Sequence, residues 1–466
     1  MNANATGQRP ARTPSHAAVI GGSIAGLLAS RVLADYFEQV TLVERDHYPD
    51  TAAPRKSLPQ SRHLHVLLAR GRLALEQLFP GIGDELMTAG AEVIDAARDI
   101  AWLTPAGWGT RFPSEIRSFA CSRPLLDQVI HRRVSSIERL SIFENTEAAG
   151  LHLGADRARV TGVVLGARGA VTSRGERVLA ADLVVDASGR SSRTPEWLAS
   201  LGFERPEETV VNAYLGYASR IYERPRVAPA DWKCLYVQAA PPRRTRGGVA
   251  FAIEGGRWMV TLGGIGGDYP PTDEAGFLDF MGSLESRELV EIVKSARPLS
   301  PVVGYRATEN RWRHYERVSR RPEGLLVLGD AACTFNPVYG QGMTMAALAA
   351  LGLGESLVAE CGRPDHTLDG LAARFQRRLA QINKGPWLLA TSEDFRSPRF
   401  DGPRPGLTIR LMHRYLDRVI AQATRDEGLR RTFLGVLHMI EAPSALVRPA
   451  MLAKVLCRPL PAGTLS

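Results

Sequence analysis

The chain has 466 residues, of which 44% are hydrophobic and 23% charged, and its formal net charge is +9. This ordinary globular composition excludes a disordered chain or a collagen-like repeat, and the length predicts about three domains or one large interleaved unit. The arginines that carry the charge are scattered rather than gathered with aromatic residues on one face, so we expect an anionic substrate or a phosphate-bearing cofactor and no nucleic acid.

The first elements along the chain predict a βαβ unit. Residues 1–15 are polar with two prolines, which predicts a flexible tail. The apolar run 17–20 predicts a short buried strand, residues 26–36 carry apolar side chains at helical spacing, and residues 40–44 predict a second strand. A right-handed crossover makes the two strands parallel.

Further buried strands are predicted at residues 181–186 and 324–330. The second of these strands ends in an acid, and its exit loop, residues 335–342, leads into an alanine-rich helix at 343–350. These elements fit the same nucleotide-binding unit as the first βαβ, although they lie far from it in the chain.

Two other stretches have a different pattern. Residues 91–120 and 205–320 are rich in aromatic side chains and contain alternating runs, which predicts an antiparallel or mixed sheet. After about residue 360 the chain is arginine-rich and predicted to be helical.

The segment between the first strand and the first helix matches a phosphate-binding turn. Residues 21–26 read GGSIAG, which is GxGxxG except that Ser23 replaces the second glycine. The motif needs a tight turn at Gly21, room for a pyrophosphate at Ser23 and close packing at Gly26, and serine is small enough for its place. The helix N-terminus offers free N–H groups to the anion, and Glu44 can accept hydrogen bonds from an adenosine ribose. Because this carboxylate repels a 2′-phosphate, NAD and FAD are favoured over NADP.

A later motif separates FAD from NAD. Asp330, Pro337 and the run 340–343 resemble the second flavin motif of the group A flavoprotein monooxygenases, which have the para-hydroxybenzoate hydroxylase-like fold. The resemblance implies that the cofactor is FAD and that Asp330 binds its ribityl chain. It also implies that the following helix points its N-terminus at the flavin N1–C2=O edge, where reduced flavin is anionic. Arg123 is similar to the arginine at a helix start that helps to hold FAD in this family.

The third family motif departs from the usual pattern. Residues 186–193 stand where the family has its DG motif, with Ser188 in place of the aspartate, so the resemblance assigns this motif no pyrophosphate or nicotinamide contact. The residues expected to hold FAD are Gly21, Gly22, Ser23, Ala25, Gly26, Glu44, Arg45, Arg123, Asp330, Pro337, Gly340, Gly342 and Met343.

Within the family, the chain most resembles actinobacterial polyether epoxidases, which convert polyene chains of polyketides into epoxides. The similar stretches are residues 55–65, 119–123 and 335–343, together with Trp258, Thr261 and the prolines 270–271. The resemblance implies a hydrophobic polyketide-type substrate in antibiotic biosynthesis. NAD(P)H would reduce the FAD, and a flavin C4a-hydroperoxide would pass one oxygen atom to an alkene or an aromatic ring.

The sequence identifies no catalytic residue, because epoxidation demands no acid–base pair. Hydroxylation of a phenol would need a base, for which Tyr214, Tyr217, Tyr236 and His314 are candidates, although wall or core positions suit them better. We expect the substrate pocket to be lined by Tyr214, Tyr217, Tyr236 and Trp258. No second βαβ glycine motif is present, since the glycines at 263–267 lead into prolines, so NAD(P)H is expected to bind transiently at the surface.

Two rival functions share this fold. A flavin halogenase carries a WxWxIP motif and a lysine well after the first glycine turn, and neither is found here. A cyclase that keeps FAD as a structural element, for example for a decalin-forming [4+2] closure of a polyketide, is not excluded by any motif and stays the alternative.

Cysteine and histidine usage predicts the compartment. The five cysteines are an odd number without a CxxC pair, and His63 and His65 are the one close histidine pair, so neither a disulfide framework nor a metal site is expected. The apolar run 17–29 is interrupted by glycines, and no segment reaches the roughly 20 uninterrupted apolar residues of a membrane span. A cytoplasmic enzyme of undetermined oligomeric state is therefore predicted.

The combined prediction is an α/β protein in which a Rossmann-like FAD domain is interleaved with a mixed or antiparallel sheet domain. The expected FAD domain comprises residues 16–90, 121–204 and 321–360, the substrate domain 91–120 and 205–320, and the helical C-terminal region 361–466. The substrate is expected between the two sheets, since such sites form at domain interfaces.

Overall fold

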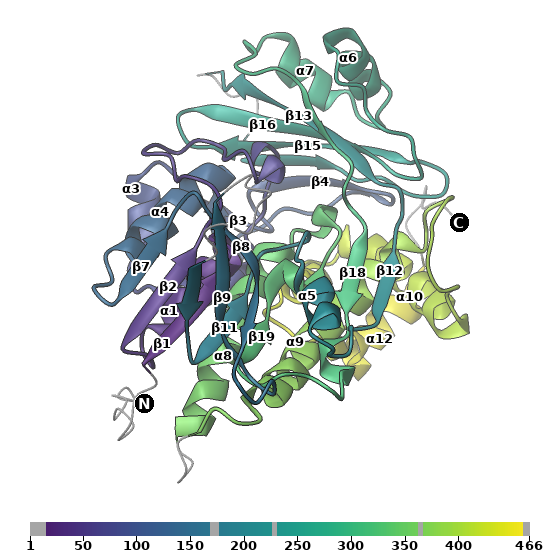
Figure 1. Ribbon diagram of the computed structural model, residues 1–466. Helices are drawn as coiled ribbons and strands as arrows, with labels where there is room; N and C mark the ends of the chain where they lie inside the picture. The colour runs from purple at the N-terminus through teal and green to yellow at the C-terminus, as the bar shows by residue number, and fades with distance from the viewer. Residues whose placement is uncertain (1–14, 168–176, 226–230, 362–366, 460–466) are drawn as a thin grey trace.

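A parallel sheet and a larger mixed sheet form the centre of the molecule, and helices of the C-terminal region pack beside them (Figure 1). The predicted α/β class, with a Rossmann-like unit, a second sheet and a helical C-terminal region, is confirmed. The computed structural model describes residues 15–167, 177–225, 231–361 and 367–459. The tail predicted at the N-terminus falls, up to residue 14, outside these residues.

The parallel sheet is built from segments that are far apart in the sequence. From one edge to the other its strands are β19 (Leu325–Val327), β11 (Leu183–Asp186), β1 (His16–Ile20), β2 (Gln39–Val43) and β7 (Leu140–Phe143). In the centre, Ala17 of β1 pairs in parallel with Val40 of β2 on one side and Leu183 of β11 on the other. The parallel βαβ unit predicted from the first 44 residues is therefore present.

Both faces of these strands are covered. Helix α1 (Ile24–Leu33) packs against the sheet and also against α4 (Arg123–Ser135) and α8 (Gly342–Cys361), and α4 contacts the edge strand β7. The antiparallel sheet of β8 (Thr146–Leu153), β9 (Val160–Ala167) and β10 (Arg177–Ala180) also contacts the parallel strands. The continuous apolar runs of the strands follow from this, since side chains on both faces are buried.

Helix α8 is long and apolar enough, by length and composition alone, to cross a membrane. In this fold 56% of the most apolar stretch of α8, within Gly342–Glu360, is buried inside the protein. The helix packs against α1, against α2 (Ala69–Leu78) and against α9 (Leu371–Asp394). Its apolar composition is explained by this central position.

The mixed sheet is built around a central antiparallel layer. From edge to edge its strands are β17 (Val303–Tyr305), β13 (Gly216–Glu223), β16 (Arg257–Gly264), β15 (Arg246–Ile253), β14 (Cys234–Val237), β4 (Ile100–Thr104) and β5 (Gly107–Trp108). Neighbouring strands are antiparallel except β14 and β4, which run parallel. One face is covered by α6 (Glu274–Gly282) and α7 (Glu288–Lys294), and the other faces the unit of the parallel sheet.

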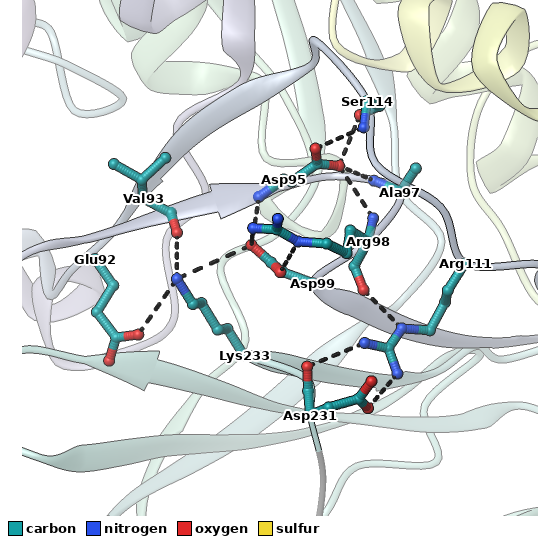
Figure 2. Close-up of polar contacts among 10 residues, drawn as sticks. All are labelled: Glu92, Val93, Asp95, Ala97, Arg98, Asp99, Arg111, Ser114, Asp231 and Lys233. Atoms are coloured by element: carbon teal, nitrogen blue, oxygen red, sulfur yellow. Dashed lines mark hydrogen bonds and ion pairs between the residues drawn. The ribbon is translucent and has the colours of Figure 1, made fainter.

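Charged side chains join the segment that carries β4 to β14 (Figure 2). The Lys233 Nζ donates to the Val93 carbonyl oxygen at 2.6 Å and lies 3.7 Å from a Glu92 carboxylate oxygen and 4.0 Å from Asp99. The Asp99 carboxylate also accepts from the backbone N–H of Asp95 at 2.9 Å. The charged groups of this cluster have their partners within it. We therefore interpret the cluster as a structural contact that holds together chain segments distant in sequence.

The remaining elements lie between and beside the sheets. The C-terminal region contains α9, α10 (Leu407–Ala423), α11 (Glu427–Leu437), the 3-10 turn Pro443–Val447 and α12 (Pro449–Leu456). Smaller elements are α3 (Ile82–Thr88), α5 (Thr194–Ser200), the strand pair β3 (Glu92–Asp95) and β6 (Arg117–Ala120), and the sheet of β12 (Glu208–Val211), β18 (Asn310–Arg313) and β20 (Cys333–Thr334).

The cysteines described by the structure are free thiols. Cys121 and Cys234 are buried, and burial raises the pKa of each thiol to about 12, so both stay protonated and unreactive. Cys333 is also buried, whereas Cys457 is exposed. Within the same described ranges no group of three or more His, Cys, Asp or Glu side chains is placed to hold a metal ion.

Candidate functional site

A cavity of about 380 Å³ lies where the carboxyl ends of the parallel strands meet the mixed sheet. Ligands of open α/β sheets bind at this edge, because the turns that follow the strands are free to shape a crevice. The predicted cofactor residues in its wall are Gly21, Gly22, Ser23, Ala25, Glu44, Arg45, Arg123, Asp330, Pro337, Gly340, Gly342 and Met343. Gly26 is absent from the wall and lies behind it, against Gly21.

The turn after β1 is shaped by its glycines. Gly21 has a φ of +96°, and a Cβ there would lie 2.7 Å from the Ala187 carbonyl oxygen. A Cβ at Gly26 would lie 1.7 Å from the Gly21 carbonyl oxygen, so only glycine lets α1 start this close to β1. The first N–H groups of α1, which have no partner within the helix, consequently border the cavity at Ser23 and Ala25.

Glu44 is held rigidly at the end of β2. Its carboxylate accepts from the backbone N–H of Gly22 at 2.6 Å and from that of Asp46 at 2.8 Å. Arg55 lies 3.4 Å from the same carboxylate, and it donates to the Gly22 carbonyl oxygen at 2.9 Å. Because a carboxylate offers about four acceptor positions, Glu44 keeps capacity for donors on the cavity side.

Asp330 follows β19 and lines the cavity. Among the described residues, none donates a hydrogen bond to its carboxylate. Burial raises the pKa of Asp330, and the guanidinium groups of Arg190 and Arg123 partly offset this rise. The Asp330 side chain is half-buried, and a carboxylate without a donor at the cavity wall favours a ligand that carries hydroxyl groups.

The N-terminus of α8 opens on the same cavity. Gly340 has a φ of +64°, which turns the chain from the Pro337 turn into the helix. A Cβ at Gly342 would meet nothing within 4 Å, so the first residue of α8 borders open space. The free N–H groups and the positive dipole end of this helix suit an anionic group.

The third motif builds a turn and presents no carboxylate to the cavity. Ser188 donates through its backbone N–H and its hydroxyl to one Asp186 oxygen, at 2.9 and 2.5 Å. The Ser192 and Thr194 hydroxyls donate to the other oxygen, at 2.5 and 2.6 Å. Asp186 is fully buried and absent from the cavity wall, whereas Ser188 lines it.

Aromatic side chains close the cavity at the mixed sheet. Tyr305 of β17 lines it, and its ring centroid lies 5.3 Å from that of Tyr217 on β13. His63 packs edge-on against Tyr217 at 4.8 Å, and its Nδ1 lies 2.8 Å from the Ser219 hydroxyl. Burial, together with the nearby charge of Arg62, lowers the pKa of His63 to about 4, so its imidazole is neutral at physiological pH.

The comparison with known proteins decides the family. Residues 15–379 match the family described as "FAD binding domain". Protein Rv3254 of Mycobacterium tuberculosis is 34% identical over 442 residues, which cover 92% of this chain and 90% of that protein. The chain belongs to the FAD-binding family. Its resemblance to the group A flavoprotein monooxygenases is thereby confirmed, while the polyketide epoxidase subtype stays a prediction.

Solved structures share the fold at low sequence identity. A triple mutant of the flavin-dependent brominase Bmp2 has a TM-score of 0.64 and 16% identity, with 93% of this chain and 98% of that chain covered. PqsL of P. aeruginosa in complex with 2-aminobenzoylacetate has a TM-score of 0.60 and 17% identity, with 83% and 98% covered. At such identities the likeness concerns the fold alone.

The cavity fits FAD in the chemistry of its walls. The amides of the α1 N-terminus and the cation of Arg123 suit a pyrophosphate, and the carboxylate of Glu44 suits the hydroxyl groups of a ribose. Asp330 offers acceptors for the ribityl hydroxyl groups, and the N-terminus of α8 suits the pole of the flavin that becomes negative on reduction.

The residues predicted to line the substrate pocket are spread over several places. Tyr217 packs against Tyr305. On the same face of the sheet, the Tyr236 ring lies tilted against that of Trp102, with the ring centroids 5.6 Å apart. None of the four predicted residues is part of the cavity wall. The Tyr214 hydroxyl bonds to Asp401, away from the cavity.

Trp258 is on the opposite face of the mixed sheet. It is 3% exposed, is paired in register with Tyr222, and packs with Trp232 in the core beneath α6 and α7. Successive side chains of a strand point to opposite faces, so a shift of one residue separates a pocket position from a core position. His314 is likewise buried, between Thr209 and Glu316.

Two wall residues, Arg190 and Tyr305, and one residue that supports the wall, Arg55, were not singled out by the sequence prediction. Arg190 bridges to Glu309 at 2.8 Å, and Tyr305 forms the wall at the sheet edge. Arg55, which supports the turn at Gly22, opens the stretch 55–65 that resembles the epoxidases, so a signal existed for it. No pattern in the sequence pointed to Tyr305, because its neighbours in space are distant in sequence.

Proposed function

We propose that the protein is an FAD-dependent monooxygenase that uses NAD(P)H and O₂ to epoxidise or hydroxylate a hydrophobic, polyketide-type substrate. The observation that carries this proposal is that the Ser23 turn, Asp330 and the α8 N-terminus border the same cavity as Tyr305 of the mixed sheet. A cofactor held by the first three would have its reactive end beside Tyr305, at the boundary between the two sheets.

Bound FAD supplies the chemistry of two-electron transfer and oxygen activation. The side chains around it bind, orient and shield. Arg123, Glu44 and Asp330 hold the cofactor by its phosphates and hydroxyl groups, and the α8 N-terminus stabilises negative charge on the flavin. Tyr305 and its apolar neighbours exclude water from the reacting region.

The net reaction consumes one alkene, one NAD(P)H, one proton and one O₂. One oxygen atom forms the two C–O bonds of the epoxide, and the other leaves as water, while NAD(P)H loses two electrons as hydride. NAD(P)H binds transiently in this proposal, since the sequence carries one dinucleotide turn. The enzyme is proposed to work in the cytoplasm, where NAD(P)H is available.

An apolar wall supports the hydrophobic substrate class. Besides Tyr305, the cavity wall contains the apolar side chains of Leu64, Val66, Phe335 and Pro337. Tyr217 and Tyr305 are half-buried, and desolvation raises the pKa of each phenol, so neither is ionised at neutral pH. Alkene epoxidation, which needs no base, suits such a wall better than phenol hydroxylation.

The test is anaerobic mixing of the purified protein with NADH or NADPH while the flavin absorbance is followed. We expect bleaching of the flavin, and on admission of labelled O₂ a linear polyene probe should gain one labelled oxygen atom. The matched reaction without nicotinamide should leave the probe unchanged.

Two outcomes would overturn the proposal. A protein that neither carries FAD nor takes it up would remove the cofactor from the mechanism. A flavin that stays oxidised while the polyene is cyclised without reductant would identify the alternative, a cyclase in which FAD is structural.

A further inference from the structure

Asp394 is a buried carboxylate at the end of α9, outside the residues that match the FAD-binding family. It is 4% exposed. Its oxygens accept from the side-chain amide of Asn310 at 2.5 Å, from that of Asn336 at 3.0 Å and from the Tyr339 hydroxyl at 2.7 Å. No arginine, lysine or histidine of the described residues forms an ion pair with it.

Two of these three donors belong to the turn that leads into α8. Asn336 and Tyr339 flank Pro337, which lines the cavity. The backbone N–H of Asn336 also donates to the Asn310 side-chain oxygen at 2.7 Å, and its side-chain oxygen accepts from the N–H of Val338 at 3.2 Å. One carboxylate on α9 therefore fixes both ends of the Pro337 turn.

The chemistry of this contact is specific to a carboxylate. Burial raises the pKa of Asp394 to about 6, and the three donors oppose this rise, so the group is ionised at pH 8. Its neighbour Glu393 faces the other way, toward Arg396. Hydrogen bonds from neutral donors to an ion are among the stronger ones, and an amide at position 394 would set an N–H₂ group against three other donors.

We propose that Asp394 is a positioning residue for FAD, which holds the turn 336–339 so that Pro337, Gly340 and the α8 N-terminus meet the flavin. The inference rests on the proposed FAD site. It implies that the end of α9, beyond the matched residues, is part of the cofactor site, because Asp394 holds one wall of that site from behind.

The test is the FAD affinity of the full-length apoprotein at pH 8, measured by fluorescence titration, together with the visible circular dichroism of the bound flavin. Asp394→Asn is expected to weaken FAD binding about tenfold or more and to alter the flavin circular dichroism. Glu393→Gln changes the adjacent carboxylate, for which the described residues show an ion pair with Arg396 and no hydrogen bond to the turn, so it is the matched control and should bind FAD as the wild type does.

A reciprocal exchange separates positioning from general stability. In the double variant D394N/N336D the donor and the acceptor change places, so FAD affinity and the flavin circular dichroism should return toward the wild type. If Asp394→Asn fails to fold, Tyr339→Phe removes one donor alone and should still weaken FAD binding severalfold.

Two results would contradict the positioning role of Asp394. Wild-type affinity and wild-type circular dichroism in both Asp394→Asn and Tyr339→Phe would overturn the inference, as would an exchange variant that stays as impaired as Asp394→Asn. Failure of the wild type itself to bind FAD would instead overturn the proposed function, so the two failures are distinguishable.

Discussion

The Ser23 hydroxyl accepts a hydrogen bond from Nη2 of Arg123 at 2.9 Å. Ser23 is the N-cap residue of α1, yet its side chain makes no capping bond to the helix. The serine that replaces the second glycine of the motif therefore joins α1 to α4 and leaves the first amides of α1 free for an anion. Both residues line the cavity, and Arg123 is 7% exposed.

Arg123→Met is expected to weaken FAD binding about tenfold or more, because it removes a buried cation and its hydrogen bond at the phosphate end of the cavity. Equilibrium titration of the apoprotein with FAD measures the effect. Arg132→Met, at the exposed end of the same helix, is the control and should leave the affinity unchanged. Equal affinities for both variants would mean that Arg123 does not contact the cofactor.

Gly26→Ala should destabilise the fold by about 1–3 kcal/mol, because the added methyl group would overlap the Gly21 carbonyl oxygen. Urea unfolding of the apoprotein gives the difference in unfolding free energy. Gly282→Ala, where an added Cβ meets nothing within 4 Å, is the control. If Gly26→Ala were as stable as Gly282→Ala, the close approach of α1 to β1 would be disproved.

Gly342→Ala should lower the affinity for FAD without lowering the stability of the fold. Its methyl group would enter the cavity without touching the protein, and alanine is favoured over glycine in a helix, so the unfolding free energy should stay level or rise by up to about 1 kcal/mol. FAD binding should nevertheless weaken, because the space at the α8 N-terminus shrinks. An unchanged FAD affinity would contradict a flavin position at the N-terminus of α8.

Tyr305 and Trp258 form a matched pair of aromatic residues on opposite faces of the mixed sheet. Tyr305→Leu should raise the fraction of NAD(P)H consumed that ends as hydrogen peroxide, because a smaller side chain admits water to the reacting region. Trp258→Phe should lower the unfolding free energy by about 1 kcal/mol or more and leave this fraction unchanged. The reverse pattern would show that Trp258 borders the substrate.

Asp426 predicts a pH dependence of stability in the C-terminal helices. Partial burial alone would raise its pKa, but the N–H of Leu429 and the cations of Lys454 and Arg458 lower the pKa to about 2. A depressed pKa in the folded state adds stability above the ordinary value of 3.8, and this stability is lost as the pH falls toward 2.

The measurement for Asp426 is the difference in unfolding free energy between the wild type and Asp426→Asn. Asparagine still caps α11, so the variant removes the charge and keeps the cap. The wild type should be more stable by about 1 kcal/mol at pH 7, and the difference should shrink between pH 4 and pH 2. A difference in unfolding free energy that stays constant between pH 4 and pH 2 would contradict the lowered pKa of Asp426.

Much of the cavity wall was predictable because its signals are local. The glycine at 21, the acid at 44 and the acid at 330 each stand directly after or within one or two residues of an apolar run that predicts a buried strand. Parallel strands end at the same edge of a sheet, which brings these turns together without further information. The positions of Gly21, Glu44 and Asp330 around one cavity follow from that rule.

The substrate side was less accessible to prediction because its residues belong to strands whose faces cannot be distinguished locally. Trp258 and Tyr236 both occur in alternating aromatic segments, yet Trp258 packs beneath α6 and α7 while Tyr236 faces the other unit. Which face is inner depends on the layer that covers each side of the sheet, and this is set by pairing with distant strands.

The sequence by itself therefore indicated the FAD-binding family through its resemblance to known flavoproteins. It also indicated the parallel βαβ core and the turn at residues 21–26, since these rest on short-range spacing and on the conformational limits of glycine. Only the tertiary structure decided that Tyr305 closes the cavity, that Arg123 meets Ser23 and that Asp394 holds the Pro337 turn from α9. These contacts join residues separated by tens to hundreds of positions, and they exist because burial forces each polar group to find its partner wherever packing brings one near.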